Sequence, residues 1–159
     1  MIQPTSLHVD KVSAKLDVIE INEISLSNTT PVIAWFREDL RLTDNPALHA
    51  AVCSGRPLIC LYIHDKETAG LRPLGGASKW WLDKSLQSLA KDINAVGGHL
   101  TLRSGQSEAV MQEIVDQTGA ETIVWNRRYG KPERDLDSKI KQSLKNNGVN
   151  VTSYNARLL

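Results

Sequence analysis

The sequence predicts an α/β fold, a doubly wound five-stranded parallel sheet flanked by helices. Short apolar runs alternate with helix-like segments along most of the chain, and the runs lack the polar alternation of a half-exposed strand. Such alternation is typical of βαβ units with right-handed crossovers, which place helices on both faces of a parallel sheet. The predicted strands are 31–36, 57–63, 99–103, 122–125 and 149–154.

Four helices are expected between these strands, each from local start and stop signals. The second is the longest, and its apolar residues recur at spacings of four and three, which predicts one buried stripe. The expected starts are Pro46 after an Asn45 or Asp44 cap, the segment 75–78, a Ser107 cap, and Pro132.

Length and composition indicate one globular domain. Residues 1–30 lack glycine and read as an extension or linker of unknown structure, so the domain is assigned to 31–159. Nineteen basic and eighteen acidic residues give a net charge of +1, which predicts neither nucleic acid nor membrane as a partner. We expect a cytoplasmic chain, because the sequence shows no secretory signal, no apolar run long enough to span a membrane and no cysteine pattern that indicates a set of disulfide bonds.

The loop after the first strand carries charge where nucleotide-binding folds carry glycine. Dinucleotide-binding folds and P-loops need glycine there, and the loop has none before Gly55. Its charges alternate in sign, which predicts internal ion pairs and caps that fix the turn. Arg37 and Asp39 are the two that we expect to face a ligand as well. The charged residues are Arg37, Glu38, Asp39, Arg41 and Asp44.

The remaining loops leave alternatives open. Residues 75–78 could hold an anion on free N–H groups or form an ordinary helix start. Trp80 and Trp81 lie about 100° apart on their helix, so one is expected to pack on the sheet and the other to cover a neighbouring domain or ligand. The segment 125–129 could stack on a planar ligand or form a packed rim. No residue pattern indicates a catalytic triad or a metal site.

The segment WFREDLRLTDNPAL, residues 35–48, resembles the opening signature of DNA photolyases and cryptochromes. Family chains begin with a strand followed by W-[FH]-R-x-D-L-R-x-x-D-N, and every fixed position is met here. GGASKWWLDKSLQSL, residues 75–89, and the WN-x-x-Y segment, residues 125–129, resemble the family in the same order. The resemblance covers residues 31–159.

This resemblance implies a light-harvesting domain that is not catalytic by itself. In the family, the amino-terminal α/β domain holds an antenna chromophore, and a larger helical domain binds FAD and receives the DNA lesion. Full-length relatives use blue light and FAD to split pyrimidine dimers. The expected partners are therefore the FAD-binding helical domain and, through a full-length protein only, UV-damaged DNA. The sequence ends where the family continues, so we expect a fragment or a truncated homologue.

The resemblance also implies chromophore-binding residues, beside Arg37 and Asp39. Glu133 falls where folate-type photolyases hold the pterin with a glutamate. Tyr62 matches an aromatic contact of deazaflavin-type relatives, whose aspartate and arginine would fall at Arg128 and Ser78. Methenyltetrahydrofolate is therefore preferred, with 8-hydroxy-deazaflavin or a flavin as alternatives, and FAD is expected only in the helical domain.

Neither set of residues is complete. Pro132 replaces the asparagine of the folate type, and Arg72 appears where that type has a histidine. Two other functions stay open: a generic nucleotide- or flavin-binding module, which the lack of a glycine-rich phosphate loop disfavours, and a non-catalytic interaction domain.

Overall fold

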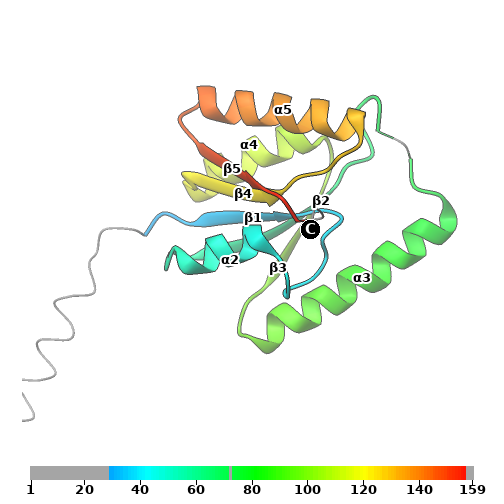
Figure 1. Ribbon diagram of the computed structural model, residues 1–159, viewed down its shortest axis with the longest axis horizontal. Coiled ribbons are helices and arrows are strands. Elements are labelled where there is room, and N and C mark those ends of the chain that lie inside the picture. The colour runs from blue at the N-terminus through cyan, green and yellow to red at the C-terminus, as the bar shows by residue number, and fades with distance from the viewer. Residues whose placement is uncertain (1–28, 72, 157–159) are drawn as a thin grey trace, which may run out of the picture.

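The computed structural model describes residues 29–71 and 73–156, so most of the predicted extension lies outside the described residues. Figure 1 shows a central sheet with α2 and α3 on one side and α4 and α5 on the other. This is the α/β architecture that the sequence predicts. The elements are β1 (Val32–Phe36), α2 (Pro46–Cys53), β2 (Leu58–His64), α3 (Gly76–Ala95), β3 (Leu100–Ser104), α4 (Ser107–Thr118), β4 (Thr122–Asn126), α5 (Lys131–Asn146) and β5 (Asn150–Tyr154).

All five strands are parallel, in the order β3-β2-β1-β4-β5. The first strand is therefore central, and all five of its residues are buried. The chain winds outward from β1 in both directions, so the order reverses between β1 and β4. In open sheets of this kind, ligands bind beyond the carboxyl ends of the strands at such a reversal.

Alternate residues of the strands feed two separate hydrophobic cores. Ile33 and Trp35 pack with the inner stripe of α4 and α5. Val32, Ala34 and Phe36 pack with α2 and the carboxyl-terminal half of α3. Side-chain direction in β1 thus places position 37, one residue beyond the strand, on the α4/α5 side.

The glycine-free turn after β1 is closed mainly by Arg41. Its guanidinium donates to the carbonyl oxygens of Thr43 and Asp44, at 3.2 and 2.9 Å, and pairs with the Asp44 carboxylate at 3.3 Å. Asp44 adopts a φ of 48°, a left-handed conformation that aspartate tolerates better than most residues. The Asn45 side chain then caps α2 by accepting from the N–H of Leu48 at 3.0 Å. The predicted pairing and capping of this turn are confirmed for these residues.

The prediction that Ser107 caps α4 is wrong. Ser107 is the first helical residue, and Gln106 occupies the cap position without a side-chain hydrogen bond. The Asp65 carboxylate, from the end of β2, accepts from the Ser107 N–H instead, at 2.9 Å. The sheet thereby brings a distant acceptor to an N–H group that a local cap would otherwise satisfy.

The prediction for Trp80 and Trp81 is also wrong in part, because neither tryptophan packs on the sheet. Their exposed fractions are 57% and 66%. The fully buried residues of α3, Leu89 and Ile93, lie in its second half, and Figure 1 shows the first half diverging from the sheet. The two indoles contact each other edge to face, at 5.4 Å between centroids.

Within residues 29–71 and 73–156, no helix has the length and apolar character needed to span a membrane.

Candidate functional site

A pair of buried tryptophans marks the point where the strand order reverses. Trp35 of β1 and Trp125 of β4 are register partners in the sheet, so their indoles project to the same side. The rings meet edge to face with centroids 5.4 Å apart. Arg37, two residues beyond Trp35, lies on the same side and places its guanidinium carbon 4.7 Å from the Trp35 ring centroid. The guanidinium of Arg37 therefore lies over the indole ring of Trp35.

One carboxylate pairs with two arginines here. Asp137 of α5 accepts from Arg37 at 2.5 Å and from Arg128 at 2.7 Å, and all three side chains are largely buried. Arg37 also donates to the backbone carbonyl of Asn126. Burial lowers the pKa of Arg37, and the negative charge of Asp137 counteracts that effect. Arg37 thus pairs outside its own loop, with a helix one hundred residues away.

A buried amide ties the first loop to β4. The Asn126 side chain donates to Asp39 at 2.5 Å and to Asn45 at 2.7 Å, and it accepts from the N–H of Ala47 at 3.1 Å. Asp39 also accepts from the Arg37 N–H at 2.8 Å. The Asp39 carboxylate therefore positions the backbone around Arg37.

A cavity of about 180 Å³ is lined by Trp35 and Arg37. Small-molecule sites usually measure about 300 Å³ or more, so a ligand here would also need cover from another segment. It lies at the carboxyl ends of β1 and β2 and the amino ends of α4 and α5. Its lining consists of Trp35, Arg37, Glu38, Tyr62, Ile63, His64, Asp65, Leu71, Leu74, Ser107, Arg128 and Glu133.

Three buried N–H donors among the cavity residues have no acceptor in the described chain. They are the indole Nε1 of Trp35 and the Nε atoms of Arg37 and Arg128. Buried donors without a partner cost free energy, and such groups often mark a ligand site. Aromatic walls with unsatisfied donors fit a planar ring that carries carbonyl or ring-nitrogen acceptors.

The titrating groups of the cavity are held in defined states. Burial raises the pKa of Tyr62, so its phenol stays protonated at neutral pH. Burial, together with the nearby charges of Lys66 and Lys79, lowers the pKa of His64, so its imidazole is neutral. Tyr62 and His64 consequently add hydrogen-bonding capacity without net charge.

Asp65 stays charged at the cavity wall. Partial burial alone would raise its pKa, but hydrogen bonds from Ser107 and Thr68 outweigh burial and lower the pKa to about 2. The Thr68 hydroxyl donates to it at 2.6 Å. This carboxylate therefore holds the β2–α3 loop to the start of α4.

Glu133 lies in the first turn of α5 and folds back over the turn before it. A Cβ atom built on Gly130 would lie 2.0 Å from its Oε2 atom. Gly130 has ordinary backbone angles, φ −62° and ψ 144°, and the contacting atom is the end of a flexible side chain, so an alanine there would displace the Glu133 carboxylate at little cost. Position 130 therefore controls where the Glu133 carboxylate lies.

The structure gathers four of the six sequence-predicted chromophore residues around one cavity: Arg37, Tyr62, Arg128 and Glu133. Asp39 lines a smaller adjoining cavity, which it shares with Arg37 and Arg128. Ser78 is exposed in the first turn of α3 and does not line this cavity.

Several contributors were not predicted. Asp137 was not among the predicted site residues, although its position four residues after Glu133 places both on adjacent turns of one helix. The position of Asp65 directly after a predicted strand could have indicated a site residue, because ligands bind at the carboxyl ends of parallel strands. Nothing in the sequence indicates that the indole N–H of Trp35 lacks an acceptor, because tertiary packing decides which polar atoms are buried away from water.

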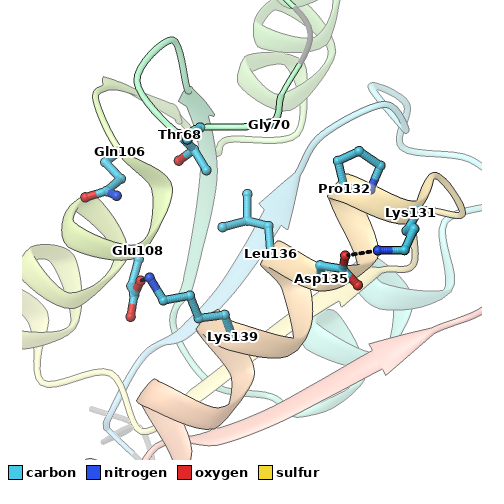
Figure 2. Close-up of a pocket in the computed structure, with 10 residues that line it drawn as sticks. Thr68, Gly70, Gln106, Glu108, Lys131, Pro132, Asp135, Leu136 and Lys139 are labelled. Carbon is cyan, nitrogen blue, oxygen red and sulfur yellow. Dashed lines mark hydrogen bonds and ion pairs between the residues drawn. The ribbon is translucent and has the colours of Figure 1, made fainter.

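A larger cavity, about 450 Å³, lies between the β2–α3 loop and the starts of α4 and α5. Figure 2 shows Lys131 paired with Asp135, and Lys139 reaching Glu108 of α4. The two ion pairs measure 3.1 and 2.8 Å. Because these four side chains form two ion pairs, the lining of this cavity carries no net charge to attract a charged ligand.

Comparisons with known proteins agree with the fold. The family model described as DNA photolyase matches residues 32–159. A deoxyribodipyrimidine photo-lyase from Agrobacterium fabrum is 48% identical over 131 residues, which cover 82% of this chain and 27% of the relative. Cryptochrome-1 of Arabidopsis thaliana is 41% identical and is covered over 19% of its length.

A solved structure has the same fold. The crystal structure of a bacterial class III photolyase from Agrobacterium tumefaciens superposes with a TM-score of 0.76 at 43% identity, covering 86% of this chain and 30% of the other. The fold and the family match thus identify an amino-terminal photolyase-like α/β domain. The chain belongs to the DNA photolyase family, and it spans about a quarter of the photolyase that it matches.

Proposed function

We propose that this domain is the light-harvesting module of a photolyase-family protein and that it binds an antenna chromophore in the cavity above Trp35. The observation that carries the proposal is the set of acceptor-free buried donors on Trp35, Arg37 and Arg128 around an aromatic-walled cavity. When bound, such a chromophore absorbs light and passes excitation energy to a flavin.

The residues divide the binding task by their chemistry. The Arg37 and Arg128 guanidiniums offer donors to carbonyl or ring-nitrogen acceptors, and Trp35 supplies an apolar wall. Tyr62 stays neutral and offers a hydroxyl. Glu133 offers carboxylate acceptors to amino and ring N–H groups, which suits the pterin of methenyltetrahydrofolate. We therefore prefer the folate over 8-hydroxy-deazaflavin and flavin.

Further, we propose that the remainder of a full-length protein completes the site. The supporting observations are the small volume of the cavity and the exposed apolar surface at Leu74, Trp80 and Trp81. Exposed apolar surface of this kind usually marks an interface. A helical domain packed there would bind FAD and UV-damaged DNA, and repair of pyrimidine dimers would belong to the full-length protein.

Reconstitution tests the chromophore proposal. Methenyltetrahydrofolate, 8-hydroxy-deazaflavin and FMN are titrated separately into the 159-residue chain and into a full-length protein, and chromophore fluorescence is recorded. We expect the folate to bind, more tightly to the full-length protein. Binding of none of the three to either protein would refute the proposal, whereas tightest binding of another chromophore would refute only the folate preference.

Two variants test the role of Glu133. Glu133→Gln removes the charge, and Gly130→Ala displaces the carboxylate while its backbone angles remain acceptable for alanine. Both should weaken folate binding by about tenfold, which corresponds to ~1.4 kcal/mol. Unchanged affinity in both variants, with normal folding by circular dichroism, would exclude Glu133 from the site.

A further inference from the structure

A second groove lies on the other side of Arg128, between α5 and the carboxyl ends of β4 and β5. Its volume is about 360 Å³, within the usual range for small-molecule sites. No residue expected to hold the chromophore lines it except Arg128. The lining residues are Trp125, Arg127, Arg128, Tyr129, Arg134, Asp137, Ser138, Lys141 and Ser153.

The charge of this groove is unbalanced. It is lined by four cationic side chains and one carboxylate, and that carboxylate, Asp137, is already shared by Arg128 and Arg37. Arg134 and Lys141 form no ion pair among the residues that the structure describes. The groove therefore presents at least two uncompensated cations.

Arg127 is fixed in place by neutral partners. Its guanidinium donates to the Ser153 hydroxyl at 3.2 Å and to the Asn155 side-chain oxygen at 2.9 Å. Its backbone N–H donates to the carbonyl of Tyr154 at 2.8 Å. These contacts orient the group without neutralising its charge, so its field is available to an anion.

The cations on α5 share one face of the helix. Arg134, Ser138 and Lys141 are spaced by four and three residues, which places them in one row. Burial first, and then the charges of Lys145 and Arg127, lower the pKa of Lys141. Mutual repulsion of cations that lack a counter-charge is relieved when an anion binds.

One aromatic ring lies beside these cations. Tyr129, in the β4–α5 loop, lines the groove and is 39% exposed. A half-exposed ring next to arginine side chains is a suitable surface for stacking a flat heterocycle. The groove thus combines a set of phosphate-type donors with a stacking surface.

We propose that this groove binds a phosphorylated small molecule with a planar ring, of the nucleotide class. The cations Arg127, Arg134 and Lys141 would hold the phosphate groups through charge-assisted hydrogen bonds, and Tyr129 would stack on the ring. This site is distinct from the chromophore cavity and goes beyond the light-harvesting function.

Two lysines of α5 that line the other cavity offer a matched control. Lys131 and Lys139 are exposed lysines of the same helix, but each is already paired, with Asp135 and Glu108 respectively. Figure 2 shows both facing the other cavity. Neutralising either changes the net charge as much as Lys141→Gln does, so a purely non-specific charge effect would be equal in all three.

The test is binding of a fluorescent ADP analogue to the 159-residue chain, followed by competition with ADP, pyrophosphate and adenosine. We expect ADP to compete at least tenfold better than adenosine and the affinity to fall as salt rises. Arg134→Gln and Lys141→Gln should each weaken binding about three- to tenfold, because each removes one charge-assisted contact in a partly screened site. Lys131→Gln and Lys139→Gln should stay within twofold.

Three outcomes of the ADP experiment would overturn the proposal. They are no binding at millimolar ADP, equal competition by adenosine and ADP, and equal losses in the groove variants and the controls. A single-stranded oligonucleotide that binds more tightly than ADP and loses affinity in the same variants would also overturn it, since the surface would then serve nucleic acid. Glu133→Gln should not change ADP binding, so failure here is distinguishable from failure of the chromophore proposal.

Discussion

Asp137→Asn is expected to destabilise the fold more than any other single charge removal near the site. The substitution keeps the shape of the side chain but removes the negative charge that Arg37 and Arg128 share. Arginine does not release its proton, since its pKa stays too high. Two buried guanidinium groups would therefore lose the carboxylate that pairs with both of them.

The expected magnitude follows from the burial of the partners. The exposed fractions of the side chains are 5% for Arg37, 14% for Arg128 and 13% for Asp137. Removing one partner of a buried ion pair costs about 3–5 kcal/mol. Arg37 keeps its bond to the Asn126 carbonyl and its contact with Trp35, so we expect the lower end, about 3 kcal/mol. For a domain of this size that is a fall in Tm of about 10 °C.

Urea unfolding of the 159-residue chain measures this change, with tryptophan fluorescence as the signal, since Trp35 and Trp125 are buried. Asp135→Asn is the matched control, because it makes the same chemical change two residues away. Its partner Lys131 is exposed, so the control should change the free energy of unfolding by less than about 0.5 kcal/mol. A loss below 1 kcal/mol for Asp137→Asn would refute the idea that this carboxylate stabilises two buried cations.

Three further predictions concern the surroundings of the site. Asn126→Ala removes three buried hydrogen bonds and should cost about 2–4 kcal/mol in urea unfolding; a cost under 1 kcal/mol would contradict the network. The pKa of Asp65 is about 2 in the folded state, below its ordinary value, so the charged carboxylate stabilises the fold fully above pH 4 and this stabilisation is lost as pH falls through 2. After discounting for solvent exposure, we expect the free energy of unfolding to fall by about 1 kcal/mol over this range. The Asp65→Asn variant should lack this pH-dependent fall. Trp80→Ala and Trp81→Ala should change the Tm of this chain by no more than about 2 °C. In a full-length protein, the same substitutions should weaken the packing of a helical domain, which limited proteolysis measures. A fall of about 10 °C in the Tm of this chain would instead show that the indoles support the α/β core.

The strands and helices were predictable because each is specified by neighbouring residues. Pro46 after Asn45 starts α2 as expected, since cap chemistry depends on a few consecutive positions. The start of α4 was not predictable at the same level, because its acceptor, Asp65, comes from a different part of the chain. The prediction that one of Trp80 and Trp81 packs on the sheet was wrong for a related reason. Helical spacing shows which residues share a face of a helix, but not where the helix diverges from the sheet.

The α/β class, the glycine-free first turn and the family could all be predicted from the sequence, because the residues that carry them are contiguous. The sequence also named Arg37, Tyr62, Arg128 and Glu133, which lie around one cavity. The pairing of Asp137 with both arginines and the lack of an acceptor for the Trp35 donor follow only from the three-dimensional packing. Pairing and desolvation depend on atoms brought together from distant segments, and these are fixed by the strand order of the sheet.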